Sequence, residues 1–181
     1  MAQIIVYYSR TGGNYVNGTI ENLSIGNTAR AAKMIQKETK AAMFSIEQVV
    51  PYSTDYNACI AQAQSDQRRD ARPELQQYPE NLEQYDTIYL GYPNYWGTMP
   101  MAVFTFLEHF DFSGKTILPF CTHEGSGMGN SEKDIKRMCP GAIVKKGLAI
   151  KGAAIQNTPT AAEEAIRRWL LEVEVYPAKS K

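Results

Sequence analysis

The sequence predicts a three-layer α/β/α protein in which a doubly wound, five-stranded parallel β-sheet lies between two layers of helices. Short apolar runs alternate with helical segments along the chain, and these runs are too apolar for a sheet with one face in water. Strands joined by right-handed helical crossovers are parallel, which fixes the fold class. Because 181 residues fit one hydrophobic core, we expect residues 1–181 to form a single domain.

The first strand and the first helix follow from the N-terminal pattern. Residues 3–8 form a short, mostly apolar run with β-branched and aromatic residues that leads into a glycine-containing loop, as is typical of a buried strand. After a long polar stretch, Asn27-Thr28 can cap a helix in which small and apolar side chains recur at helical spacing.

The remaining elements continue the alternation. Turn residues and helix caps bound most of them, such as the Ser131-x-x-Asp134 capping box and the Pro140-Gly141 stop. The predicted strands span residues 42–50, 86–92, 115–121 and 142–150. The predicted helices span residues 99–110, 131–139 and 160–171, and a Ser53-Thr54-Asp55 cap region precedes a further helix that reaches about Arg69.

The composition excludes several classes of partner. The 19 basic and 19 acidic residues balance, so no long-range field attracts nucleic acid or an anionic membrane. No apolar run is long enough to cross a bilayer, and the N-terminus lacks the features of a secretory signal, so we expect a cytoplasmic protein. The three cysteines lack CxxC spacing, which argues against a disulfide framework or a zinc site. The expected partner is a small molecule.

Ligands of open α/β sheets bind outside the carboxyl ends of the strands, where the strand order reverses. The loop after the first strand contains Ser9, Arg10 and Thr11, and Asn27 and Thr28 follow at the next helix. Hydroxyls and unpaired N–H groups at a helix N-terminus suit a phosphate, although an ordinary turn with a helix cap would have the same composition. The chain has neither GxxxxGK[ST] nor GxGxxG, so neither an NTPase nor a Rossmann dinucleotide site is supported.

The loop after the third strand contains Pro93, Asn94, Tyr95, Trp96 and Gly97. Large aromatic side chains beyond the end of a sheet are difficult to explain as core, and they offer flat faces to a planar ligand. The alternative is a loop folded back on its own hydrophobic cluster.

The loop after the fourth strand is rich in glycine. Glycines let backbone N–H groups approach the edge of a ligand without obstruction, whereas the alternative is a flexible, solvated loop. Its candidate residues are Thr122, His123, Glu124, Gly125, Ser126 and Gly127.

At three motifs the chain resembles the flavodoxin-like family, specifically its compact FMN-binding bacterial branch. The motifs are YYSRTG, GYPNYWGTMP and FLEHFDFSGKTILPFCTHEGSGMGNSEKDIKRMCPGA. The resemblance implies one bound FMN, a strand order of 2-1-3-4-5, and electron transfer through the flavin. It assigns the phosphate to the first loop and the flavin ring to the other two. An insertion, residues 13–25, departs from simpler flavodoxins, and it either lies over the flavin or mediates contacts in a homodimer.

The neutral charge leaves two functions open. Flavodoxins that act as mobile carriers are strongly acidic, which steers them to basic partner proteins. The alternative is an FMN-dependent NAD(P)H oxidoreductase that reduces quinones or similar small acceptors. A receiver domain would need acidic residues where this chain has Ser9-Arg10 and Pro93-Asn94. We expect Cys121 to pack in the core rather than act as a nucleophile, and no catalytic side chain is assigned.

Overall fold

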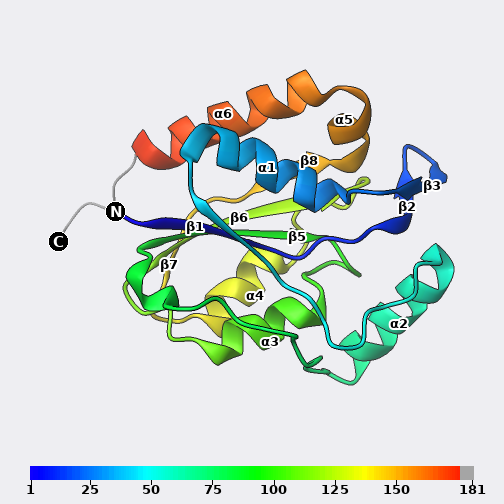
Figure 1. Cartoon of the computed structure of the whole chain (residues 1–181), viewed down its shortest axis with the longest axis horizontal. Helices are drawn as coiled ribbons and strands as arrows, with labels where there is room; N and C mark the ends of the chain where they lie inside the picture. The colour runs from blue at the N-terminus through cyan, green and yellow to red at the C-terminus, as the bar shows by residue number, and fades with distance from the viewer. Residues whose placement is uncertain (176–181) are drawn as a thin grey trace.

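The computed structural model describes residues 1–175 and places a parallel sheet between helices (Figure 1). The strands are β1 (Gln3–Tyr7), β4 (Ala42–Ser45), β5 (Thr87–Pro93), β6 (Thr116–His123), β7 (Ile143–Val144) and β8 (Leu148–Lys151). Their order is β4-β1-β5-β6-β7, and β8 also pairs with β6. In register, Leu90 of β5 lies opposite Val6 of β1 and Pro119 of β6. This confirms the predicted doubly wound order.

Helices cover both faces of the sheet (Figure 1). On one face lie α1 (Asn27–Thr39), α5 (Gly152–Asn157) and α6 (Pro159–Val175), and on the other lie α3 (Met101–His109) and α4 (Ser131–Met138). A further helix, α2 (Tyr56–Arg68), lies near the carboxyl ends of the strands, and a short 3-10 helix, η1 (Leu82–Gln84), precedes β5. Among residues 1–175, no helix has the length and apolarity needed to cross a bilayer.

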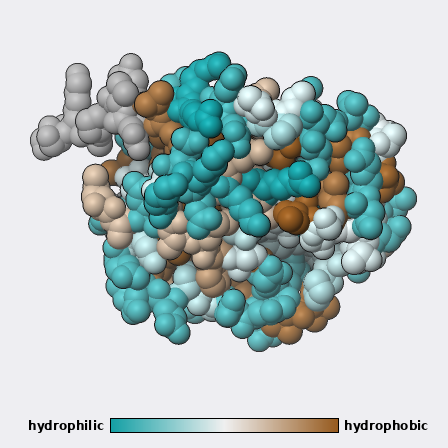
Figure 2. Space-filling view, turned by 45° about the horizontal axis from the view of Figure 1, so that its top comes forward, coloured by the Kyte–Doolittle hydropathy of each residue, from teal (hydrophilic) through white to brown (hydrophobic). Residues whose placement is uncertain are grey.

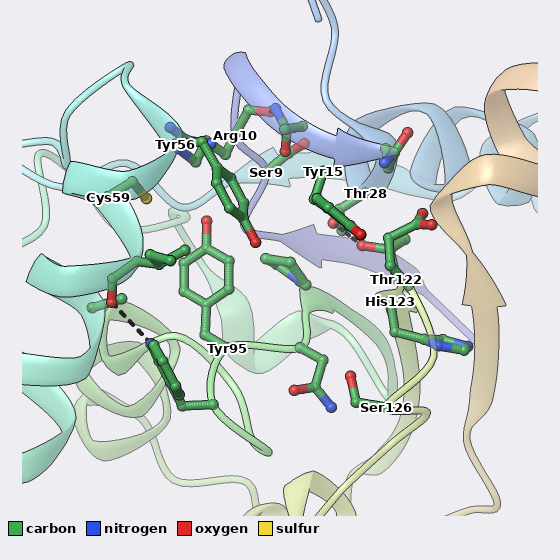
Figure 3. A pocket seen from close by; sticks show the side chains of 18 of the residues that line it. Ser9, Arg10, Tyr15, Thr28, Tyr56, Cys59, Tyr95, Thr122, His123 and Ser126 are labelled. Carbon is green, nitrogen blue, oxygen red and sulfur yellow. Dashed lines mark hydrogen bonds between the residues drawn. The ribbon is translucent and has the colours of Figure 1, made fainter. Parts of the chain in front are cut away.

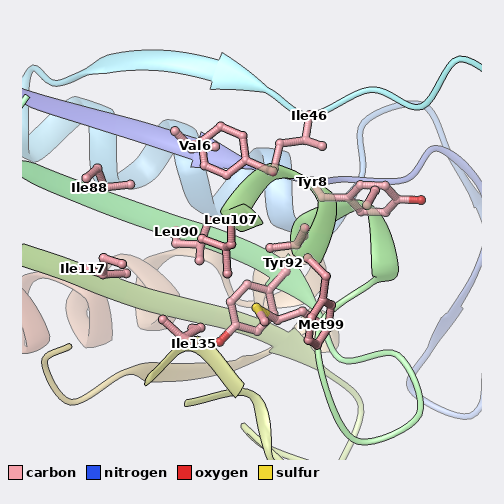
Figure 4. Packing of buried hydrophobic residues seen from close by; sticks show 14 of the residues in the cluster. Val6, Tyr8, Ile46, Ile88, Leu90, Tyr92, Met99, Leu107, Ile117 and Ile135 are labelled. Atoms are coloured by element: carbon pink, nitrogen blue, oxygen red, sulfur yellow. The ribbon is translucent and has the colours of Figure 1, made fainter. Parts of the chain in front are cut away.

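Each face of the sheet has its own buried cluster, because successive side chains of a strand point to opposite faces. Val6 and Leu90 pack with Leu107 of α3 on one face (Figure 4), whereas Ile5 packs with Ile35 of α1 on the other. Hydrophilic residues cover most of the surface shown in Figure 2, and apolar residues appear there as separate spots. The buried clusters hold the strand ends, and the loops that follow them, in fixed positions.

The fifth predicted strand, residues 142–150, is divided into β7 and β8. Between them, the backbone bonds to side chains: Gly147 N–H donates to Glu132 Oε1 at 2.6 Å, and the indole N–H of Trp169 donates to the Lys146 carbonyl at 2.9 Å. A Cβ on Gly147 would lie 2.5 Å from the Met128 side chain, so glycine permits this approach. Sequence periodicity cannot detect such a break.

A further predicted strand was too long. The strand predicted for residues 42–50 ends at Ser45. The helix predicted after the Ser53-Thr54-Asp55 cap region begins at Tyr56, as expected, because Asp55 caps it by accepting from Ala58 N–H at 2.8 Å. No pattern in the sequence indicated α5, which follows β8 directly.

The insertion after β1 forms a hairpin that was not predicted. Strands β2 (Gly12–Val16) and β3 (Thr19–Leu23) pair antiparallel as a separate two-stranded sheet. Asn17 and Gly18 form its turn with φ values of 49° and 89°. Positive φ at both central residues is characteristic of type I′ hairpin turns, which favour Asn-Gly.

Candidate functional site

A cavity of about 480 Å³ lies at the carboxyl edge of the sheet (Figure 3). This volume is within the range of small-ligand sites, about 300–1,000 Å³. All the predicted site residues except Thr11 and Gly127 line the cavity. The structure therefore brings the three predicted loops together at one place, as expected for an open α/β sheet.

The N-terminus of α1 forms one end of the cavity. Ser9 Oγ accepts from Ala29 N–H at 3.0 Å, so the first loop is fastened to the helix while the Ser9 hydroxyl can still donate. A Cβ on Gly26 would lie 2.4 Å from the Arg10 carbonyl oxygen, so glycine permits the close approach of this loop. The N–H groups of Asn27 and Thr28 have no acceptor among residues 1–175. Two donors at the positive end of a helix are therefore available to an anion.

The side chains of these helix residues bind protein groups. Thr28 Oγ1 lies 2.8 Å from Thr122 Oγ1, and both residues are buried, so this pair joins α1 to the end of β6. Asn27 Oδ1 accepts from Gln156 Nε2 of α5 at 2.6 Å. The backbone of the helix start, rather than these side chains, is thus the free part of the predicted phosphate site.

Arg10 has a role that the sequence did not predict. Its guanidinium donates to the carbonyl oxygens of Gly13, Ser53 and Thr54, the latter two at 2.9 and 3.1 Å. These bonds join the base of the hairpin to the loop before α2. Thr11, another predicted phosphate residue, is exposed and does not line the cavity.

Asn94 connects the two loops predicted to bind a planar ring. Its Nδ2 donates to the Gly127 carbonyl at 2.9 Å, and its Oδ1 accepts from Gly97 N–H at 2.9 Å. Its own N–H donates to the Thr122 carbonyl at 2.8 Å. Gly127, with φ 63°, therefore supports the cavity from outside its lining.

Four aromatic side chains contribute to the apolar part of the wall (Figure 3). Trp96 is 48% exposed and donates from Nε1 to the Ile60 carbonyl of α2 at 2.9 Å. Burial raises the pKa of Tyr95, so its phenol is neutral at physiological pH. The rings of Tyr15 and Tyr56 stack with centroids 6.0 Å apart and planes 28° from parallel.

The loop after β6 carries two oriented side chains. His123 Nδ1 accepts from Gly125 N–H at 2.9 Å. Burial lowers the pKa of His123, which favours a neutral imidazole with its proton on Nε2. Glu124 accepts two backbone N–H groups, from Ala153 to Oε1 at 2.8 Å and from Asn17 to Oε2 at 3.1 Å.

Sequence reasoning missed the part of the wall that α2 supplies. It offered the insertion as lying over the flavin or mediating contacts in a homodimer, but it named no lining residue there. The lining residues of the hairpin and α2 are Asn14, Tyr15, Tyr56, Cys59, Ile60 and Ala63. The α2 members recur at helical spacing, and the Asn17-Gly18 dipeptide marks the hairpin, but neither pattern points to a ligand. Cys121 is fully buried, as predicted, and burial raises the pKa of its thiol to about 12.

Comparison with known proteins identifies the family. The model of the flavodoxin family matches residues 19–171. A protein named as a flavoprotein from Bacteroides eggerthii DSM 20697 has 28% identity and a TM-score of 0.75, with 96% of this chain and 98% of that chain covered. A second, from Bacteroides uniformis ATCC 8492, has 28% identity and a TM-score of 0.72, with 94% and 97% covered.

A flavoprotein from Lactobacillus acidophilus NCFM, solved in complex with FMN, has the same fold. Its identity is 16% and its TM-score 0.63, with 93% of this chain and 98% of that chain covered. No curated protein matches the chain. Because the family model covers most of the 181 residues, the chain belongs to the flavodoxin family.

Proposed function

We propose that the cavity binds one FMN and that the protein uses it in electron transfer. The observation that carries this proposal is the pairing of a helix start, which has two free N–H donors, with aromatic walls in one cavity. The first suits a phosphate and the second a planar ring. Membership of the flavodoxin family and the FMN complex of a protein with the same fold support the proposal.

The residues present fit FMN at both ends. The N–H groups of Asn27 and Thr28 and the hydroxyl of Ser9 would hold the phosphate. Trp96 and Tyr95 would lie against the ring and exclude water from it. A Cβ on Gly125 would meet nothing within 4 Å, so the backbone there is open to the edge of a ligand.

When bound, FMN supplies the exchange of one or two electrons, and the protein tunes its potential through contacts and hydrogen bonds. The neutral phenol of Tyr95 adds no negative charge beside the ring. The neutral imidazole of His123 has Nε2–H as its donor, because Nδ1 accepts from Gly125. Water exclusion by the aromatic walls disfavours extra negative charge on the ring.

A second candidate function is the NAD(P)H-dependent reduction of quinones or similar small acceptors. Of the cavity-lining residues that the structure describes, Arg10 and Glu124 bear charge, and both are bonded to backbone groups of the protein. The chain as a whole has no net charge. Without a net negative charge to steer the chain to a basic partner protein, a small uncharged acceptor is favoured.

The cofactor proposal is tested by titrating the purified, flavin-free protein with FMN and, separately, with riboflavin, which lacks the phosphate. We expect FMN to bind more tightly than riboflavin, and quenching of flavin fluorescence measures both affinities. Equal affinities would contradict the phosphate site, and binding of neither would contradict the cofactor.

The two functions differ in a steady-state assay. An oxidoreductase oxidises NADH or NADPH in the presence of a quinone without any other protein. A carrier shows no such turnover until a separate reductase is added.

A further inference from the structure

The hairpin formed by β2 and β3 is fastened to the molecule at its base. Gly13 N–H donates to the Thr54 carbonyl at 3.0 Å, and the Arg10 guanidinium donates to the Gly13 carbonyl. The Asn14 side chain donates to the Arg10 carbonyl at 3.2 Å. These bonds fix where the hairpin begins but not the position of its turn.

The turn is held by Glu124. Its Oε2 accepts from Asn17 N–H at 3.1 Å, across 107 positions of sequence. The other oxygen accepts from Ala153 N–H of α5 at 2.8 Å, which fixes the carboxylate. A Cβ on the neighbouring Gly152 would lie 2.6 Å from Oε1, so a larger residue there would displace the carboxylate. One carboxylate thus joins the loop after β6, the hairpin turn and α5.

The hairpin places Tyr15 in the cavity wall. Tyr15 is 42% exposed, lines the cavity, and stacks on Tyr56 of α2 (Figure 3). This stack is the only hairpin contact among the ring pairs of residues 1–175. Covering the exposed part of this ring with a ligand would remove apolar surface from water, which is favourable.

We propose that Tyr15 is a further aromatic contact for the flavin and that Glu124 is a positioning residue that holds the hairpin over the site. The inference rests on the proposed binding of FMN. Because Glu124 anchors the turn and Tyr15 precedes that turn, loss of the carboxylate acts on the flavin through Tyr15. The hairpin would thereby slow release of the cofactor.

Release of FMN, followed by the recovery of flavin fluorescence after dilution, tests the role of Tyr15. We expect Tyr15→Ala and Tyr15→Leu to release FMN about three- to tenfold faster, the size of one aromatic contact. Tyr15→Phe keeps the ring and should release FMN at the unsubstituted rate. The leucine variant retains apolar packing, so its release rate can still be measured if the alanine variant fails to fold.

Two measurements test the role of Glu124. In the flavin-free protein, Glu124→Ala should speed hydrogen exchange of the Asn17 amide, whereas Glu21→Ala, on the exposed strand β3, should leave it unchanged. In the FMN-bound protein, Glu124→Ala should speed release on its own but add nothing to Tyr15→Ala, because both changes remove the same contact.

Each part can fail separately. Unchanged release from both Tyr15→Ala and Tyr15→Leu would overturn the role of Tyr15. A full effect of Glu124→Ala in the Tyr15→Ala background, or unchanged exchange at Asn17, would overturn the positioning role. If the unsubstituted protein binds no FMN, the proposed function fails together with this inference. If it binds FMN and the variants release FMN at the same rate as it does, this inference alone is overturned.

Discussion

The two ring nitrogens of His123 have different roles. Nδ1 accepts from Gly125 N–H and so holds the loop after β6, while Nε2 carries the proton of the neutral ring. Burial lowers the pKa of His123, the charge of Lys151 lowers it further, and Glu124 opposes them. Protonation of Nδ1 would replace an acceptor with a donor facing the Gly125 N–H group. The geometry of the loop is therefore linked to pH.

This linkage predicts the pH dependence of stability. Folding favours the neutral ring, so its contribution is fully present above the ordinary histidine pKa of about 6.5 and is lost as pH falls through the lower folded pKa. His123→Gln keeps an acceptor but does not titrate. Urea unfolding of the flavin-free proteins should show the advantage of the native chain over His123→Gln shrinking from about pH 8 to about pH 5. A difference that stays constant with pH would contradict this role.

Trp96 contributes an aromatic face to the site. Trp96→Ala should weaken FMN binding by about tenfold, and it should raise the reduction potential, because water then reaches the ring. Trp96→Phe keeps an aromatic face but loses the hydrogen bond to Ile60, so it separates the two contributions. Fluorescence titration and a redox titration measure these effects, and an unaltered affinity and potential in Trp96→Ala would refute the assignment.

At the scale of elements, α2 supplies one side of the cavity, and its first turn depends on Asp55. The Asp55 carboxylate accepts from Ala58 N–H and thereby caps the helix immediately before Tyr56. Asp55→Ala should lower the free energy of unfolding by about 0.5–2 kcal/mol. Urea denaturation checks this value, and Asp55→Asn, which retains an acceptor, should lose less. Equal losses in the two variants would show that capping is not the cause.

The order of the elements could be predicted because β1, β5 and β6 are buried on both faces and therefore form continuous apolar runs. Asn17-Gly18 favours a hairpin turn, but the hairpin was not predicted, because β3 is exposed along most of its length and shows no apolar alternation beside that turn. The division of the fifth strand depends on Glu132 and Trp169, which lie outside that strand in sequence. Patterns within a segment carry no information about such contacts.

The same distinction applies to the site. The loops after β1, β5 and β6 could be predicted as a group, since the carboxyl ends of parallel strands meet at one edge. Tyr15 and Tyr56 reach the cavity only through the folding of the insertion and of α2. The bonds that engage Arg10 and Glu124 join residues far apart in sequence, so the sequence could name these residues but not their partners.

At the scale of the whole molecule, the balance of charge bears on the proposed electron transfer. A net charge of zero gives little long-range attraction to a charged partner. We expect the rate of electron transfer to an uncharged quinone to change by less than about twofold with ionic strength, because screening acts on charge pairs. Stopped-flow measurements across a range of salt concentrations check this, and a steep decrease with salt would contradict it.

The central claim, that this member of the flavodoxin family binds one FMN at the carboxyl edge of its sheet, is tested most directly by an absorbance spectrum. The spectrum is recorded on the protein as purified, and again after incubation with FMN and removal of the unbound flavin. We predict a flavin band in the blue region that corresponds to one FMN per chain. A protein that remains colourless after incubation with FMN would contradict the claim.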